Sequence, residues 1–113
     1  MVKPPYLTKT EKRALQEFKR KITQKLAGEI LELKLFGSKA RGDYKKTSDI
    51  DVFIVLKEAR KRQSDIIYDT VTQIAIDYGV YLSVKIFSLK EFQYFSSIPT
   101  IFMETISKES ISL

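Results

Sequence analysis

The chain of 113 residues contains no cysteine and no histidine. Without cysteine it can form neither disulfides nor thiolate–zinc sites. Without histidine it lacks the imidazole that serves as a metal ligand and as the base of a catalytic triad. No apolar run approaches the roughly 20 residues needed to span a bilayer. Carboxylates and lysines are therefore left to carry any chemistry.

The polar, lysine-bearing start of the chain lacks the hydrophobic stretch of a secretory signal, so we expect a cytoplasmic protein without membrane contact. Hydrophobic residues make up 43% of the sequence and charged residues 30%, a balance typical of globular proteins. The length fits one compact core. We therefore expect residues 1–113 to form a single domain, with any acceptor-binding domain on another polypeptide.

The positive charge is concentrated at the start of the chain. Residues 1–25 hold eight Lys or Arg and two Glu, while residues 26–113 hold twelve of each sign, so the net charge of +6 comes from the first segment. Such a segment can attract nucleic acid or an acidic partner. The alternative interpretation is a solvated helix face, which is the more common meaning of a charge run.

The spacing of apolar residues predicts two long helices. Thr8 and Glu11 form a capping box, after which Leu15, Phe18, Ile22 and Leu26 recur at helical spacing towards Gly28. A second helix is predicted from Arg62 to Tyr78, with Gly79 as its C-terminal stop. Shorter helices are expected from a capping box at Ser88 and Glu91 towards Phe95, and from Pro99 to near Ser107.

Alternating and apolar segments predict three strands. They cover Ile30 to Phe36, with Leu31, Leu33 and Leu35 on one side; Asp49 to Leu56; and Val80 to Phe87, whose polar side carries Tyr81, Ser83 and Lys85. A short helical segment, Lys39 to Arg41, and a polar loop, Gly42 to Ser48, join the first two strands. The order predicts an α/β (α+β) fold, with helices covering a small mixed sheet.

Asp49 and Asp51 are the candidate metal ligands. Residues two apart on a strand project from the same face, so the two carboxylates should lie side by side. A divalent cation that prefers oxygen ligands, usually Mg²⁺, relieves their repulsion. An isolated Asp-x-Asp pair is more often structural, but this one opens a strongly apolar strand.

Gly37 and Ser38 end the preceding strand in a turn that offers backbone N–H groups and a hydroxyl, which suit phosphate oxygens. A lone Gly-Ser pair would more often be an ordinary tight turn. Arg41 either contacts phosphate or forms a surface ion pair. The tandem arrangement of the turn and the aspartates, with ten residues between Ser38 and Asp49, favours a functional interpretation.

The stretch LFGSKARGDYKKTSDIDVFIVL resembles the DNA polymerase beta nucleotidyltransferase superfamily, and within it the minimal nucleotidyltransferase (MNT) proteins. The matching positions are Gly37, Ser38, Arg41, Gly42, Ser48, Asp49 and Asp51. The resemblance implies a nucleotidyltransferase fold in which Gly37, Ser38, Arg41 and Ser48 bind ATP. It also implies that Asp49 and Asp51 hold Mg²⁺ as the catalytic residues, with AMP as the transferred group.

The same resemblance implies a small helical HEPN protein as partner, because MNT proteins commonly act as antitoxins of HEPN ribonuclease toxins and some modify the toxin with AMP. One departure stands against catalysis. Catalytic relatives carry a third carboxylate on a later strand, whereas the polar face of the strand near Ser83 contains no acid. The alternatives are a nucleotide-binding subunit that neutralises its partner by contact, and a nucleic-acid-binding module that uses the basic first helix.

Overall fold

The computed structural model describes residues 6–37 and 49–113. The elements, in chain order, are α1 (Lys9–Lys25), β1 (Ile30–Phe36), β2 (Ile50–Leu56), α3 (Lys61–Tyr78), β3 (Leu82–Ser88), α4 (Leu89–Ser96), α5 (Ile101–Glu109) and β4 (Ile111–Ser112). The segments predicted at Lys39 to Arg41 and at Gly42 to Ser48 lie outside the described residues. No helix in the described ranges is long and apolar enough to cross a membrane.

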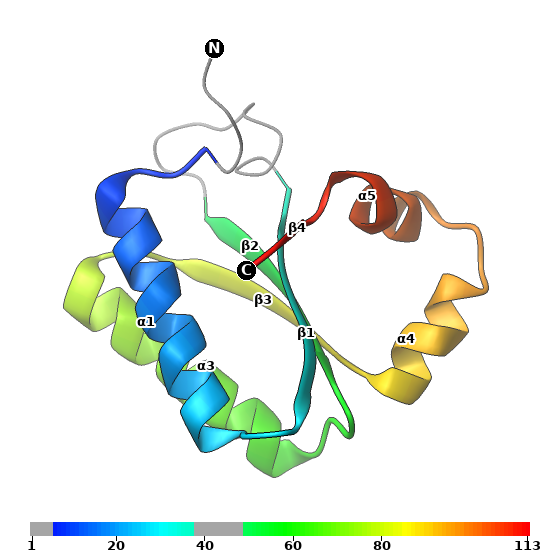
Figure 1. Cartoon of the computed structure of the whole chain (residues 1–113), viewed down its shortest axis with the longest axis horizontal. Helices are drawn as coiled ribbons and strands as arrows, with labels where there is room; N and C mark the ends of the chain where they lie inside the picture. The colour runs from blue at the N-terminus through cyan, green and yellow to red at the C-terminus, as the bar shows by residue number, and fades with distance from the viewer. Residues whose placement is uncertain (1–5, 38–48) are drawn as a thin grey trace.

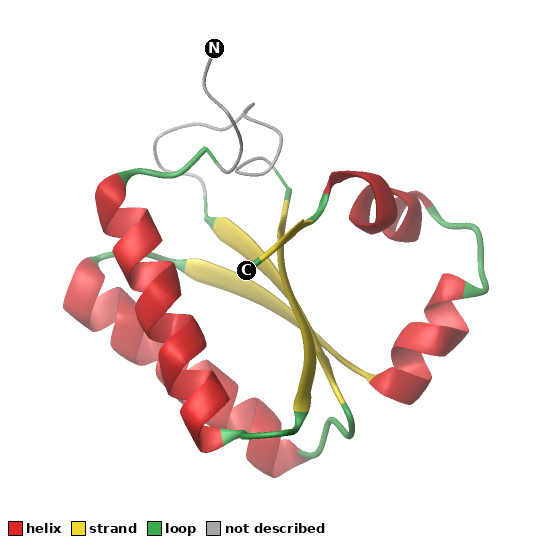
Figure 2. Cartoon of the chain, viewed as in Figure 1, coloured by secondary structure: helices red, strands yellow, loops and turns green. Residues whose placement is uncertain are grey.

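The four strands form one mixed sheet in the order β3-β2-β1-β4. β1 pairs antiparallel with β2 and with β4, whereas β2 and β3 run parallel. Figures 1 and 2 show α1 and α3 on one side of the sheet and α4 and α5 on the other. The prediction of an α/β fold with a small mixed sheet covered by helices is confirmed.

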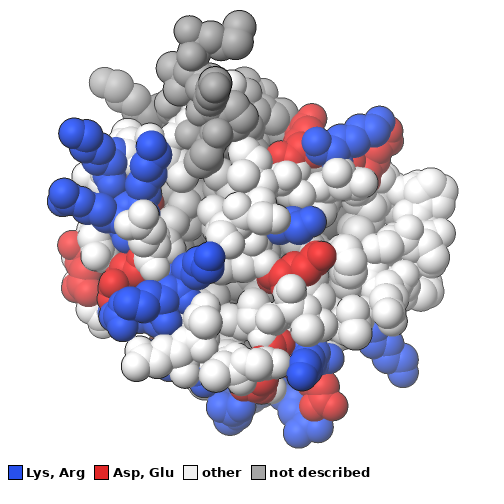
Figure 3. Space-filling model, viewed as in Figure 1, with Lys and Arg blue, Asp and Glu red and all other residues white. Residues whose placement is uncertain are grey.

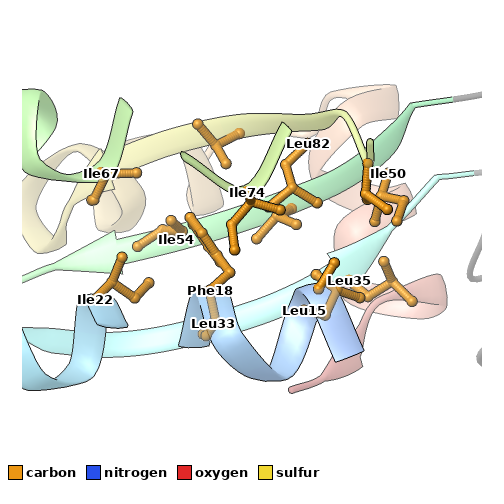
Figure 4. Close-up of a cluster of buried hydrophobic side chains, with 14 of the residues drawn as sticks. Leu15, Phe18, Ile22, Leu33, Leu35, Ile50, Ile54, Ile67, Ile74 and Leu82 are labelled. Carbon is orange, nitrogen blue, oxygen red and sulfur yellow. The ribbon is translucent and has the colours of Figure 1, made fainter. Parts of the chain in front are cut away.

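The main core lies between the sheet and the pair α1 and α3. Apolar side chains of α1 and α3 meet the inward-facing side chains of all three long strands, as the labelled residues in Figure 4 show. Phe18, Ile22, Ile54, Ile67 and Ile74 are fully buried there. At about 1.5–3 kcal/mol for each fully buried large apolar side chain, this layer provides most of the hydrophobic stabilisation.

The predicted helix boundaries on this side are confirmed to within a few residues. Thr8 caps α1: the Glu11 backbone N–H donates to Thr8 Oγ1 at 3.1 Å, and the Thr8 N–H donates to Glu11 Oε1 at 2.9 Å. Gly79 ends α3 in the left-handed region at φ 67°. Glycine suits this position because it adopts positive φ without steric cost.

The opposite face of the sheet carries a second, aromatic cluster. Phe53, Val55, Phe36 and Ile106 are buried there, with Phe87 and Phe92 packed against them. The Phe53 ring centroid lies 5.3 Å from that of Phe87 and 5.6 Å from that of Phe92, within the range of favourable aromatic pairs. The capping box predicted at Ser88 and Glu91 is present at the start of α4.

Two local predictions were wrong, and one short strand was missed. The last helix begins after Thr100, whose hydroxyl accepts from the Met103 N–H, so Pro99 precedes the helix and its cap. Leu31 is 41% exposed because the β1–β2 register shifts between Ile30 and Glu32, which breaks the expected alternation. The short strand β4 had not been predicted, since a two-residue segment carries no periodicity.

Candidate functional site

The site lies where three strands meet at one edge of the sheet. β1 ends there, whereas β2 and β3 both begin there. Asp51 is directly opposite Phe36 on β1 and Ser83 on β3. Paired residues share a face, so Asp51 and Ser83 lie on the face that carries Phe53 and the aromatic cluster. The Ile50 N–H donates to the Tyr81 carbonyl at 3.0 Å, which joins β2 to the residue before β3.

Gly37 is in direct contact with the Asp51 side chain. A Cβ added at Gly37 would collide with Asp51 Oδ2 and would stand 3.1 Å from Asp51 Cγ. Gly37 also has a φ of 75°, in the left-handed region that side chains disfavour. Both the backbone conformation and the space therefore require glycine, and the end of β1 is held against the carboxylate of β2.

The two aspartates differ in their surroundings. Asp49 is exposed and precedes β2 by one residue, so the strand is one residue shorter than predicted. Asp51 is half-buried within the strand, two residues from fully buried Phe53. Because Asp51 is half-buried near apolar side chains, water screens its carboxylate less than it screens that of Asp49, and this strengthens the attraction of Asp51 for a cation.

Several predicted site residues cannot be placed. Ser38, Arg41 and Ser48 lie outside the described residues, so their assignment to nucleotide binding stays a prediction. Gly37, Asp49 and Asp51 are brought together at one end of β2. No group of three or more acidic residues able to hold a metal occurs within residues 6–37 and 49–113.

Two residues of the polar side of β3, Ser83 and Lys85, lie on the same face of the sheet as Asp51. Ser83 is the residue opposite Asp51, and Lys85 is opposite Phe53 on the same face. Ser83 is half-buried, whereas Lys85 is exposed. A serine thus occupies the position on β3 from which a carboxylate would approach Asp51 most directly.

The contact between Gly37 and Asp51 was missed at the sequence level. The motif indicated a turn and a metal-binding pair as separate elements. Consecutive strands usually neighbour each other in a sheet, and this rule could have suggested the pairing. The register that puts Phe36 opposite Asp51 is nevertheless a three-dimensional property.

A comparison with known protein families decides the assignment. The model of the nucleotidyltransferase domain matches residues 12–106, which is most of the chain. The chain belongs to the nucleotidyltransferase domain family. Within it, a candidate protein adenylyltransferase of Methanocaldococcus jannaschii is 38% identical over 73 residues, covering 65% of this chain and 69% of the relative. Another from that organism is 29% identical over 100 residues, covering 88% and 94%.

Solved structures show the same fold. A toxin–antitoxin complex crystallised with AMP-PNP contains a chain that matches with a TM-score of 0.53 at 16% identity, over 84% of this nucleotidyltransferase and 68% of that chain. A variant of the toxin–antitoxin complex MntA–HpeT gives a TM-score of 0.52 at 14% identity, over 82% and 67%. At sequence identities this low, the structural matches establish a shared fold and nothing more specific.

Proposed function

We propose that this nucleotidyltransferase transfers AMP from ATP to a hydroxyl group of a protein partner, with Mg²⁺ bound at Asp49 and Asp51. The observation that carries the proposal is the contact between Gly37 and the Asp51 carboxylate. It joins the turn expected to hold phosphates to the pair expected to hold the metal. A metal bridging nucleotide phosphates requires these two groups to be adjacent.

The donor set fits a magnesium ion. Two carboxylates at the start of an apolar strand supply hard oxygen ligands. Mg²⁺ typically binds one or two protein carboxylates, and phosphate oxygens and water complete its coordination shell. When bound, the ion would neutralise charge on the triphosphate. Asp51, fixed against Gly37 and beside Ser83, would orient the nucleotide for reaction.

The proposed transfer balances without a further reactant. The acceptor hydroxyl oxygen forms a bond to the α-phosphorus of ATP while the bond from that phosphorus to the bridging oxygen of the β-phosphate breaks. Pyrophosphate leaves, and the hydroxyl proton passes to solvent. The turn predicted at Gly37 and Ser38 would hold the phosphates in line with the acceptor, so positioning and charge neutralisation would be the protein's main contributions.

The partner that we propose is suggested by similarity to other proteins. The sequence resembles MNT antitoxins, and the fold is shared with chains of toxin–antitoxin complexes. We therefore propose a helical HEPN-type toxin as the acceptor. AMP on a toxin side chain would add bulk and negative charge and thereby block its function.

A second candidate function is neutralisation by binding alone. It is favoured by Ser83, which stands beside Asp51 where a third carboxylate would complete the metal site. Mass spectrometry of a co-expressed helical partner separates the two functions. An added adenylyl group on the partner supports transfer, whereas a tight complex with an unmodified partner supports binding alone.

The metal site itself is tested by calorimetric titration of ATP in the presence of Mg²⁺. Asp51→Asn should weaken binding at least tenfold, about 1.4 kcal/mol, because a metal ligand is lost. Asp69→Asn is the matched control, since Asp69 is exposed on α3. Chelation of Mg²⁺ should reduce the wild type to the level of Asp51→Asn. Equal affinity in wild type and Asp51→Asn would refute the assignment.

A further inference from the structure

Tyr81 lies next to the candidate metal site, just before β3 begins at the same edge of the sheet. The Ile50 N–H donates to the Tyr81 carbonyl at 3.0 Å, as in a parallel ladder. Since Ile50 pairs with Leu82, the residue before β3 is aligned with Asp49, the residue before β2. Residues aligned in neighbouring strands lie about 5 Å apart. The backbone of Tyr81 is therefore held beside Asp49.

The side chain of Tyr81 is directed to the face of the sheet that carries Asp51. Val80 and Leu82, on either side of Tyr81, are both buried in the main core, against α1 and α3. Because side chains alternate along an extended chain, Tyr81 points the other way, as Ser83 does. Tyr81 is also 65% exposed, so its ring can change rotamer quickly. Its hydroxyl is therefore accessible to a nucleotide bound at the two aspartates.

The order of the strands gives the candidate site two ends. Gly37, at the end of β1, touches the Asp51 carboxylate, and β3 lies on the other side of β2. With the leaving pyrophosphate held at the turn predicted at Gly37 and Ser38, an in-line displacement requires the acceptor oxygen to enter from the opposite end. That end is the start of β3, where Tyr81 is exposed.

Three tyrosines of the described residues are exposed, and two of them are remote from the site. Tyr68 is 51% exposed on α3, which covers the opposite side of the sheet. Tyr94 is 63% exposed on α4, which follows the far end of β3. Ser83 is nearer to Asp51, but its side chain is short and half-buried. Tyr81 therefore combines exposure, reach and position.

We propose that Tyr81 is an internal acceptor of the AMP group, so that the chain adenylylates itself when no partner occupies the site. This inference rests on the proposed transfer of AMP from ATP. The Tyr81 hydroxyl oxygen forms a bond to the α-phosphorus while the bond from that phosphorus to the bridging oxygen of the β-phosphate breaks. Pyrophosphate leaves, and the phenolic proton passes to solvent.

The modified tyrosine would obstruct the acceptor end of the site. An adenylyl group on Tyr81 would add bulk and a negative charge beside Asp49 and Asp51. A partner seated over the start of β3 would cover Tyr81 and present its own hydroxyl instead. Self-modification and transfer to a partner should therefore exclude each other.

Incubation of the chain with ATP and Mg²⁺, followed by intact-mass and peptide mass spectrometry, tests the proposal. The wild type should gain one adenylyl group, and fragmentation should place that group on Tyr81. Tyr81→Phe should lose the adduct, because it keeps the ring and removes only the acceptor oxygen. Tyr68→Phe is the matched control on α3 and should be modified like the wild type. Circular dichroism confirms that each variant is folded.

Two further measurements locate the reacting nucleotide. Lys and Arg side chains gather over α1 in Figure 3, so ATP is also attracted to a surface across the sheet from Asp51. Asp51→Asn keeps that surface, so loss of the adduct in this variant assigns the reacting nucleotide to the aspartates. The rate per chain should stay constant over about a hundredfold range of chain concentration, because acceptor and nucleotide belong to the same molecule.

The outcomes separate this inference from the proposed function. A wild type that binds ATP with Mg²⁺ in the calorimetric titration but gains no adduct overturns the inference and leaves the proposed function standing. An adduct on another residue, such as Ser83 or Tyr44, also overturns it, as does a rate per chain that rises with concentration. Loss of nucleotide binding in Tyr81→Phe would overturn the acceptor role, because the adduct would then be lost with the nucleotide. A wild type that neither binds ATP with Mg²⁺ nor gains an adduct refutes both.

Discussion

The two sides of the sheet are built differently. On one side, α1 and α3 bury a large, mostly aliphatic core against the strands and present charged side chains to solvent. On the other side, α4 has no buried residue and α5 contributes Ile106 to a small aromatic cluster. The first side is completed within the chain. The second leaves large apolar side chains such as Tyr94 and Ile101 exposed.

β2 shows how one strand serves both sides. Ile50, Val52, Ile54 and Leu56 point into the main core, whereas Asp51, Phe53 and Val55 alternate onto the other face. Because successive side chains of a strand point to opposite faces, alternate residues of β2 contribute to the main core or to the candidate site. Stability should depend mainly on the first side, and nucleotide binding on the second.

The largest expected difference between the sides is in stability. Phe18→Ala should lower the free energy of unfolding by about 3–5 kcal/mol, because Phe18 is fully buried and leaves a cavity. Phe92→Ala on α4 should cost only about 1–2 kcal/mol, since Phe92 is half-buried and can be replaced partly by water. Urea unfolding measures both losses of stability, provided that the slope m of the free energy of unfolding against urea concentration is the same in the variants. Equal losses would refute the proposed division.

The next prediction contrasts two glycines of similar conformation. Gly37 and Gly79 have φ of 75° and 67°, so alanine at either position should cost about 1–2 kcal/mol of stability. A Cβ at Gly79 meets nothing within 4 Å, whereas one at Gly37 displaces the Asp51 carboxylate. Gly37→Ala should therefore also weaken binding of ATP with Mg²⁺ at least tenfold.

Unfolding and calorimetric titration of both variants separate strain from site geometry. If Gly79→Ala reduced nucleotide affinity as much as Gly37→Ala, the effect would come from general destabilisation. Comparable stability losses with a selective loss of affinity in Gly37→Ala would sharpen the distinction between the two sides of the sheet.

The elements with strong local signals could be predicted from the sequence. The capping boxes at Thr8 and Ser88 and the stop at Gly79 are local chemistry, so their helices were placed correctly. Leu31 was misplaced because a β-bulge depends on the partner strand. β4 was missed because its pairing with Lys34 and Leu35 is a tertiary contact.

The site could be predicted in part. Asp49 and Asp51 were found because their spacing and the apolar strand are visible in one segment. Their proximity to Gly37 depends on antiparallel pairing, and the position of Ser83 depends on parallel pairing across a helix. Neither register follows from the pattern of a single strand.

A smaller effect is expected from changing Ser83, and it concerns the number of metal ions that each chain binds. We expect the wild type to bind one Mn²⁺ per chain with nucleotide, measured by electron paramagnetic resonance, because the described residues offer no third acid near Asp51. Ser83→Asp should raise the number to two and increase pyrophosphate release with a known acceptor. Ser64→Asp on α3 is the control. Two ions in the wild type would imply a carboxylate from elsewhere.

The smallest effect is expected on the charged side, at α1. Lys12 and Lys19 are exposed, and Arg20 donates a hydrogen bond from Nε to Glu17 at 3.1 Å. That hydrogen bond lowers the pKa of the Glu17 carboxyl below its usual range. The pair therefore stabilises the fold above the ordinary carboxyl range and loses this effect as the pH falls through the lowered pKa. Glu17 is half-buried but its partner Arg20 is exposed, so screening by solvent keeps the contribution small.

Changing Lys12, Lys19 and Arg20 together to Gln should consequently leave thermal stability nearly unchanged. If α1 attracts polyanions, the same change should slow association with a fluorescent DNA duplex and reduce its salt dependence, since each lost phosphate contact lowers the slope by about one. The triple substitution Lys57, Lys61 and Lys90 to Gln is a matched control with the same change in charge on other surfaces. Identical rates and slopes for wild type and both variants would leave α1 with the role of a solvated helix face. A loss confined to the α1 variant would give the charged side of the sheet a binding function of its own.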